Sequence, residues 1–183
     1  MALSIVAASA QSAGACPVPD SRHAFSPWGD EADYVLMPGG SFEDGVGWPG
    51  SGTPQIVDAD NPLEIDGPGT RALRLGSGDS VTSPSLCIDR FYPHLRFLLR
   101  GEGDAKLKLT VRWEDANGKA KQAPLDDHDP KAYRSWGISH VVKLRKAVPR
   151  GDGAHDIRLR FRVEGRAGAW LIDDVYVDPY KRS

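Results

Sequence analysis

Residues 156–164 read DIRLRFRVE, and apolar and charged side chains alternate along them without a break. A β-strand points successive side chains to opposite faces, so a period of two indicates a strand with one buried face. The two faces of this segment are Ile157, Leu159, Phe161 and Val163 against Arg158, Arg160 and Arg162. A chain with this strand needs another apolar layer to cover the buried face.

The same alternation recurs along the chain between turn signals. Asn117-Gly118 predicts a hairpin turn, and the 20 glycines and 14 prolines favour many short elements joined by tight turns. Only residues 139–148 are ambiguous between a strand and one or two helical turns. Strands are expected at residues 34–37, 55–60, 71–76, 83–89, 94–101, 106–113, 156–164 and 169–177.

The chain has 183 residues, which is the size of a single domain. Many short antiparallel strands in one domain of this size predict an all-β fold, an antiparallel β-sandwich. We assign residues 31–183 to the sandwich and residues 1–30 to an N-terminal signal remnant or flexible arm. No internal repeat or linker divides the chain.

Residues 1–16 are small and apolar, with Ala-X-Ala patterns at 8–10 and 13–15. They resemble the end of a secretory signal peptide without its positively charged start, so we expect an extracellular or cell-surface protein. In an oxidising compartment Cys16 and Cys87 are expected to form a disulfide, which would stabilise the fold by about 4 kcal/mol. Two buried thiols in a cytosolic protein are the alternative.

Three short motifs resemble those of carbohydrate-binding-module jelly rolls, which belong to the galactose-binding-like sandwich group. They are GSFE at residues 40–43, GW at 47–48 and IDDV at 172–175. The resemblance implies a jelly roll whose first strand carries GSFE and whose last strand carries IDDV, side by side. Phe42 is then expected in the core and Trp48 over an open end. Residues 28–34 and 173–180 also resemble a secreted actinobacterial family, which implies no function.

Related jelly rolls often hold a structural Ca²⁺ where these two motifs meet, so the resemblance implies a calcium site. Carboxylate and backbone oxygens are the ligands that this cation takes. The candidate metal ligands are Glu43 and one of Asp173 or Asp174, and alternation does not decide between the two aspartates. An inward-facing Asp needs some partner, and an Arg or backbone N–H groups would serve in place of a metal.

The sequence carries no motif of a catalytic centre: no G-x-S-x-G, no phosphate loop and no H-E-x-x-H. We therefore predict a protein that is not an enzyme. The five histidines are scattered and form no close pair of metal ligands. The polar cluster at residues 126–129 is expected to be a solvated loop, with a cation-binding cluster as the alternative. The net charge of −2 argues against a nucleic-acid binder, and no apolar run is long enough for a transmembrane helix.

Aromatic side chains and arginines are the candidates for ligand recognition, because sugar rings stack on flat aromatic groups while polar groups bond their hydroxyls. Trp136 follows the expected loop and is the best single platform, with a core Trp as the alternative. The arginine stripe of residues 156–164 is either a solvated face or a surface for an acidic polymer. The candidate ligand-binding residues are Trp113, Tyr133, Trp136, Arg112, Arg158 and Arg160.

These observations predict a monomeric, non-catalytic exported binding module for a cell-surface or environmental polysaccharide. The prediction depends on the resemblance of the motifs to those of carbohydrate-binding modules. The alternative is a structural or protein-interaction module of the cell envelope with no sugar ligand. An open aromatic platform would favour the first function, and buried Trp side chains with a flat polar face would favour the second.

Overall fold

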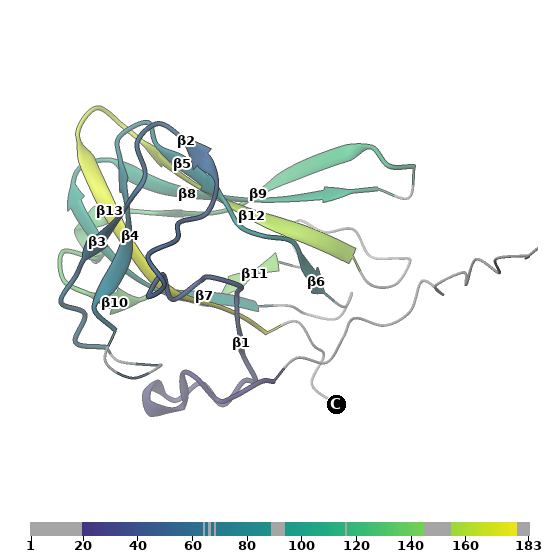
Figure 1. Ribbon diagram of the computed structural model, residues 1–183, viewed down its shortest axis with the longest axis horizontal. Helices are drawn as coiled ribbons and strands as arrows, with labels where there is room; N and C mark the ends of the chain where they lie inside the picture. The colour runs from purple at the N-terminus through teal and green to yellow at the C-terminus, as the bar shows by residue number, and fades with distance from the viewer. Residues whose placement is uncertain are drawn as a thin grey trace, which may run out of the picture.

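The computed structural model describes residues 20–63, 65, 67, 69–88, 94–115, 117–144 and 155–178. Within these ranges the protein is all-β, with two antiparallel sheets packed as a sandwich (Figure 1). The predicted fold class is confirmed. None of the helices in the described ranges is long and apolar enough to cross a membrane.

The two sheets contain seven and six strands. The first has the order β10 (Gly137–Ile138), β7 (His94–Gly103), β13 (Gly168–Asp178), β4 (Arg71–Gly76) and β3 (Gln55–Asp58), with β1 (Val35–Leu36) paired to β13 and β11 (Val142–Lys143) paired to β7. The second has the order β2 (Gly50–Ser51), β5 (Ser80–Thr82), β12 (His155–Glu164), β8 (Lys106–Glu114) and β9 (Ala120–His128), with β6 (Leu86–Ile88) paired to β12. The short 3-10 helices η1 (Ser26–Trp28) and η2 (Pro130–Ala132) lie in the connections.

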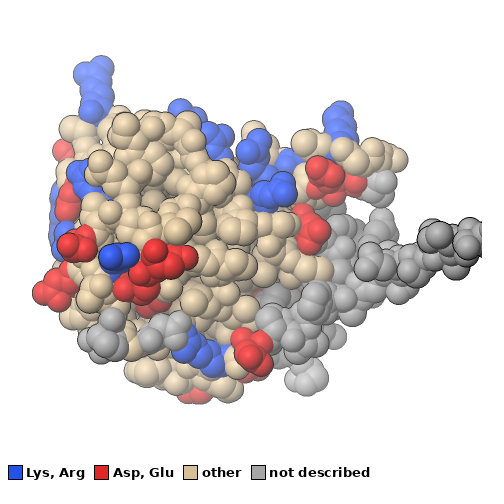
Figure 2. Space-filling view, in the orientation of Figure 1, with Lys and Arg blue, Asp and Glu red and all other residues tan. Residues whose placement is uncertain are grey.

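The core lies between the two sheets and is built by the inward faces that the alternation predicted. All four apolar side chains of β12 are fully buried. Phe97 of β7 meets Phe161 of β12 with ring centroids 5.3 Å apart. Trp170 is also fully buried, and its indole N–H donates to the carbonyl oxygen of Ala105 at 2.8 Å. The Lys and Arg side chains of the described residues stay at the surface, whereas four aspartates are buried: Asp79, Asp173, Asp174 and Asp178. In the view of Figure 2, charged side chains are scattered over a largely uncharged surface.

The GSFE motif does not form the first strand, so that expectation is wrong. Residues 39–45 form turns, and the strand beside β13 is β1, which precedes the motif. The two motifs nevertheless lie side by side, because the N–H of Val175 donates to the carbonyl oxygen of Gly40 at 3.0 Å. A Cβ on Gly40 would lie 2.9 Å from the carbonyl oxygen of Met37, which explains the glycine.

Phe42 lies in the core as expected, and Trp48, which was expected over an open end, packs in the same core cluster. Phe42 has a φ of 58°, in the left-handed region that a non-glycine residue rarely adopts. Its ring is fully buried and packs edge-on against Trp48 at a centroid distance of 5.2 Å. Burial of the two rings offsets the backbone strain.

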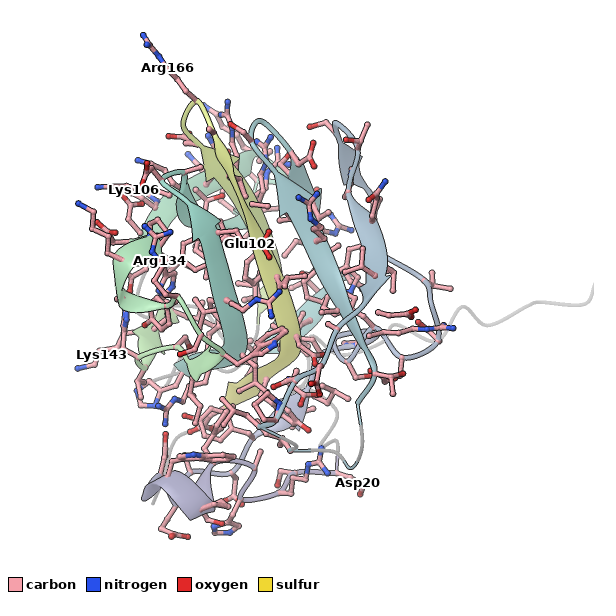
Figure 3. The ribbon with its side chains drawn as sticks, turned by 90° about the vertical axis from the view of Figure 1, so that its left-hand side faces the viewer. Asp20, Glu102, Lys106, Arg134, Lys143 and Arg166 are labelled. Atoms are coloured by element: carbon pink, nitrogen blue, oxygen red, sulfur yellow. The ribbon has the colours of Figure 1, made fainter. Side chains whose placement is uncertain are left out.

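Residues 22–34, here called the covering segment, pack on one end of the outer face of the seven-stranded sheet. Phe25 and Tyr34 are fully buried there with Leu98 of β7 and Tyr176 of β13. The rings of Phe25 and Tyr34 meet edge-on at 4.9 Å. In Figure 3 the segment, drawn in purple, lies at the lower end of the sheet, and Glu102 stands on the part above it. The second apolar cluster is therefore outside the sandwich interior.

A partly buried ion pair ties the covering segment to the sheet. Asp30 accepts from the guanidinium of Arg96 at 2.9 Å and from the hydroxyl of Tyr34 at 2.9 Å. Burial alone would raise the pKa of Asp30, but hydrogen bonds from Ala32, Tyr34 and Arg96 hold it below its ordinary value. The carboxylate thus stays ionised and keeps the segment in register.

Candidate functional site

The outer face of the six-stranded sheet carries the arginine stripe. Antiparallel pairing places Arg158 of β12 opposite Arg112 of β8, and Arg112 opposite Gln122 of β9. Like charges directly opposite each other on neighbouring strands destabilise a sheet. Lys and Arg side chains gather along the upper right of Figure 2, where these strands run. The row therefore concentrates positive charge at a cost to the fold.

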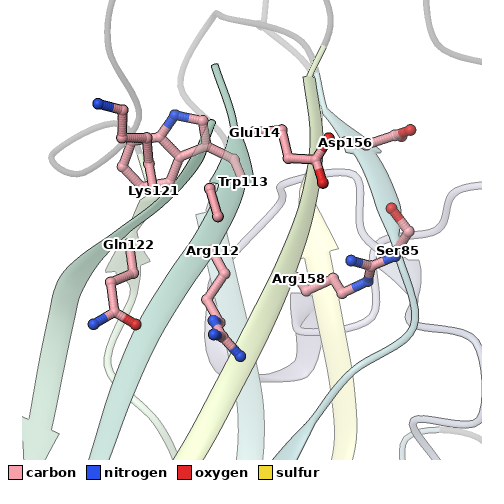
Figure 4. A pocket seen from close by; sticks show the side chains of 9 residues that line it. Ser85, Arg112, Trp113, Glu114, Lys121, Gln122, Asp156 and Arg158 are labelled. Atoms are coloured by element: carbon pink, nitrogen blue, oxygen red, sulfur yellow. The ribbon is translucent and has the colours of Figure 1, made fainter. Parts of the chain in front are cut away.

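An open groove of about 870 Å³ lies along this row (Figure 4). Arg112 and Arg158 form no ion pair with a described residue, although the carboxylates of Glu114 and Asp156 line the same groove. Guanidinium forks recognise planar anions, while amide and hydroxyl groups exchange hydrogen bonds with sugar hydroxyls. The lining residues are Ser85, Arg112, Trp113, Glu114, Ala120, Lys121, Gln122, Asp156 and Arg158.

The rest of the same face is largely neutralised by its own carboxylates. Lys108 pairs with Asp127 at 3.2 Å and with Glu164 at 3.5 Å, and Arg162 pairs with Glu164 at 3.5 Å. The hydrogen bond to Asp127 raises the pKa of Lys108. At the groove, by contrast, Arg112 and Arg158 have no ion-pair partner among the described residues, although Glu114 and Asp156 line it with them.

Arg160 and Trp113 differ from the other predicted residues of this face. Arg160 does not line the groove, and its guanidinium donates to the Oγ of Ser80 at 3.0 Å. Trp113 lines the groove, but it lies in the inward phase of β8 with Val111 and is half-buried against the core. It offers part of a ring at the groove and not a fully open platform.

Tyr133 and Trp136 lie away from the groove, beside β7. The ring of Tyr133 packs between His128 and Trp170, at centroid distances of 5.7 and 6.1 Å. Trp136 is half-buried on the cluster under the covering segment, and the guanidinium of Arg100 lies 5.7 Å from its ring centroid. The structure therefore does not bring all six predicted ligand-binding residues together.

Glu43 and Asp173 approach each other across Gly69. A methyl group on Gly69 would lie 3.3 Å from Glu43 Oε1 and 3.8 Å from Asp173 Oδ2. Glu43 already accepts from the backbone N–H groups of Thr70 and Arg71, at 3.0 and 2.9 Å. Of the two aspartates left open by the sequence, Asp173 is thus the one beside Glu43.

Asp173 is buried in a way that disfavours its charge. It is 2% exposed, and burial, with a smaller contribution from Glu43, raises its pKa to about 6. The Nδ2 of Asn61 donates to its Oδ2 at 3.0 Å. Asp174, the next residue, has a φ of 47° at a bulge in the β13–β7 ladder, and its N–H donates to Asp173 Oδ1 at 2.8 Å. The carboxylate of Asp173 thus accepts two hydrogen bonds at this bulge, one from Asn61 and one from the backbone of Asp174.

A group of Asp126, His128 and His140 could hold a metal ion. The sequence offered residues 126–129 as a possible cation binder but favoured a solvated loop, and it did not indicate His140. The ligand atoms of the three residues all lie within 4.8 Å of one another. Residues 126–128 belong to β9 and not to a solvated loop, and His128 is 1% exposed. Burial, together with the charge of His140, lowers the pKa of His128 to about 4. The sequence signal for this pair is Asp126-x-His128, because residues two apart on a strand point to the same face.

The predicted disulfide involves one residue inside and one outside the described part of the chain. Cys87 lies half-buried in β6, whereas Cys16 lies outside the described residues. The disulfide stays a prediction.

Comparison with solved structures finds carbohydrate-binding modules with the same architecture. The CBM22-1 xylan-binding domain of Paenibacillus barcinonensis Xyn10C is 18% identical, with a TM-score of 0.56 over 83% of this chain and 97% of that domain. The family 11 module of the cellulase Lic26A-Cel5E of Clostridium thermocellum is 12% identical, with a TM-score of 0.53 over 82% of this chain and 96% of that one.

A third match is a structure of the CBM22-1–GH10 modules of xylanase 10B from Clostridium thermocellum, complexed with xylohexaose. It is 17% identical, with a TM-score of 0.57 over 79% of this chain and 28% of that one. No protein-family profile matches the chain, and no curated protein matches it. The chain has the jelly-roll sandwich fold of carbohydrate-binding modules.

Proposed function

We propose that the protein is an exported, non-catalytic binding module for a polysaccharide that carries carboxylate groups. The observation that supports this most strongly is the pair of opposed arginines, Arg112 and Arg158, at an open groove with no ion-pair partner among the described residues. Their planar forks match carboxylates in bidentate geometry. A bound carboxylate would offset the repulsion between the two side chains.

The fold favours an acidic polysaccharide over other anionic ligands. Structures that match along most of the chain include a xylan-binding domain and modules complexed with xylohexaose. Beside the arginines, Gln122 and Ser85 supply donors and acceptors for hydroxyl groups, and Trp113 supplies part of an aromatic surface. A chain of uronic acid residues offers both the carboxylates and the hydroxyls that such a groove would bind.

The test is a titration of the oxidised, full-length protein with soluble polysaccharides, followed by Trp fluorescence and calorimetry. Polygalacturonate and glucuronoxylan represent acidic chains, and unsubstituted xylan represents neutral ones. We expect saturable binding of the acidic chains that weakens as salt is added. The double variant Arg112→Ala/Arg158→Ala is expected to lose this binding.

Arg162→Ala is the matched control, because Arg162 lies on the same face and strand but pairs with Glu164 outside the groove. It is expected to bind like the parent protein. If the folded parent protein binds no polysaccharide, the proposal is wrong and the envelope-interaction alternative gains. If binding is lost only in Trp136→Ala, the sugar site lies beside β7 and not at the groove.

We also propose a structural Ca²⁺ between Glu43 and Asp173, as the resemblance implies. The support is the pair of carboxylates on either side of Gly69 and the buried charge of Asp173, which a cation would compensate. EDTA is expected to lower the melting temperature and added Ca²⁺ to restore it. Because EDTA also removes any other bound metal, the deciding step is the addition of Ca²⁺ to the EDTA-treated protein. A protein with the substitution Asp173→Asn is expected not to respond to Ca²⁺, and an EDTA-treated parent protein that Ca²⁺ does not stabilise would exclude the site.

A further inference from the structure

His128 is a buried, ionisable side chain whose ring nitrogens are both left without a hydrogen-bond partner in the described part of the chain. The residue is 1% exposed. A neutral imidazole carries one N–H donor and one acceptor, and burying them unsatisfied costs free energy. The aromatic rings of Phe97 and Tyr133 pack edge-on against it, at 5.3 and 5.7 Å. The position is therefore not explained by packing alone.

Two further metal-ligating side chains meet His128 at the same point. Asp126 and His128 lie on the same face of β9. They pair with Leu109 and Leu107 of β8, which both point into the core. His140 comes from the connection between β10 and β11, and its ring lies 4.9 Å from that of His128. The Nε2 of His140 contacts Asp126 Oδ2. One ligand atom from each of the three residues lies within 4.8 Å of the others.

We propose that Asp126, His128 and His140 form a site for a divalent transition-metal ion of the Zn²⁺ class. Two imidazoles and one carboxylate are ligands that suit Zn²⁺, Ni²⁺ and Cu²⁺, whereas Ca²⁺ and Mg²⁺ prefer a shell of oxygens. Tetrahedral zinc with bonds of about 2.0–2.2 Å separates its ligand atoms by roughly 3.3 Å. The three ligand atoms now lie within 4.8 Å of one another, and small side-chain rotations would bring them to the zinc spacing.

The exposure of the three residues suits such a site. His128 is buried, Asp126 is half-buried, and the side chain of His140 is 52% exposed, so an ion can enter from solvent past His140. A neutral imidazole offers the lone pair of its unprotonated nitrogen to a metal. Three protein ligands leave a fourth position for water.

The site would link the two sheets of the sandwich. Asp126 and His128 belong to β9 of the six-stranded sheet, while His140 lies between two strands that pair with β7 of the seven-stranded sheet. A metal that binds only the folded chain stabilises it by mass action. The expected role is thus a cross-link between sheets, separate from the groove and from the Glu43–Asp173 pair.

The experiment uses the full-length protein after treatment with a chelator and dialysis. Calorimetry with ZnCl₂ is expected to show one saturable site, and a melting series is expected to show stabilisation by Zn²⁺ and Ni²⁺. His140→Ala is the main test variant because its side chain is half exposed and its loss leaves the core intact. The Zn²⁺ affinity is expected to fall by more than roughly 10–100-fold, the loss that changes outside the ligand shell already cause.

His23→Ala is the matched control, because His23 is exposed and lies between two carboxylates, 3.3 Å from Glu31 and 3.2 Å from Asp33. It is expected to bind Zn²⁺ like the parent protein. His128→Phe, which preserves the aromatic volume, is expected to abolish the site while removing the cost of the unsatisfied imidazole. Absence of a saturable site in the parent protein, or Zn²⁺ affinity unchanged in His140→Ala, would overturn the proposal.

Discussion

The two outer faces of the sandwich differ in what covers them. On the seven-stranded sheet, the covering segment buries Leu98 and Tyr176, although both point away from the sandwich interior. On the six-stranded sheet, the outward positions of β12 and β8 are charged except for Thr110, and Arg112 and Arg158 are exposed at the groove. One outer face therefore contributes to stability, whereas the other keeps a repulsive pair available for a ligand.

The largest effect is expected where the covered face is opened. Phe25→Ala removes a fully buried ring from the second apolar cluster and is expected to lower the free energy of unfolding by about 3–5 kcal/mol. Denaturant unfolding measures the change. Trp28→Ala is the control, because Trp28 is 41% exposed on the same segment. Equal losses in the two variants would contradict the burial of Phe25.

A pH-dependent effect is expected from Asp173 in the metal-free protein. Because its folded pKa is raised from 3.8 to about 6, the native state binds more protons than the unfolded state between these values. Stability is therefore lost as the pH rises from about 4 to about 6, by about 3 kcal/mol in total.

Asp173→Asn is the variant that isolates this contribution. Its amide cannot accept from both Asn61 and Asp174, so a constant loss is expected at every pH. The slope between pH 4 and pH 6 is expected to be flatter than in the parent protein. Unfolding curves measured in EDTA over this range decide the point, and parallel pH profiles would contradict the raised pKa.

A smaller loss is expected from the ion pair under the covering segment. Asp30→Ala removes the acceptor of Arg96 and Tyr34 and is expected to cost about 2 kcal/mol, in the range for hydrogen bonds to charged groups. Since the pKa of Asp30 is lowered in the folded state, this contribution is present above its unfolded pKa and is lost as the pH falls below it. Glu31→Ala, on the exposed side of the same segment, is expected to change stability by less than about 0.5 kcal/mol.

The smallest effect, with the opposite sign, is expected on the open face. Arg158→Glu places a carboxylate opposite Arg112 and is expected to raise the free energy of unfolding by about 0.2–1 kcal/mol. Binding of acidic polysaccharide is expected to be lost at the same time. Thermal unfolding and calorimetry measure the two results, and a clear loss of stability would mean that Arg158 supports the fold.

Much of the fold could be predicted from the sequence because period-two alternation reports one buried face. The strand at 156–164 and its neighbour at 106–113 were found in this way. β9 was missed because Pro124 and Asp126 read as a loop, although β9 pairs with β8 along its length through a bulge between Leu109 and Thr110. Pairing with a neighbouring strand overrode weak local preference.

Less of the candidate site could be predicted, because its residues meet only through tertiary structure. Arg112 and Arg158 were both candidates, but their opposition depends on the β8–β12 register. Tyr133 and Trp136 are candidates by residue type alone, and they lie beside β7 of the seven-stranded sheet and not at the groove. His128 and His140 are 12 positions apart and join only because opposite sheets close on each other.

The order of strands in the seven-stranded sheet has a consequence for how the chain can fold during synthesis. β13, the last described strand, lies between β7 and β4 and also pairs with β1, joining Val177 to Val35. Until β13 emerges from the ribosome, β3–β4 and β7 with its partners are separate half-sheets with open edges. Pairing over such sequence distances folds slowly and leaves strand edges prone to aggregation. Loss of residues 168–178 would thus divide the sheet through its middle, and not trim its edge.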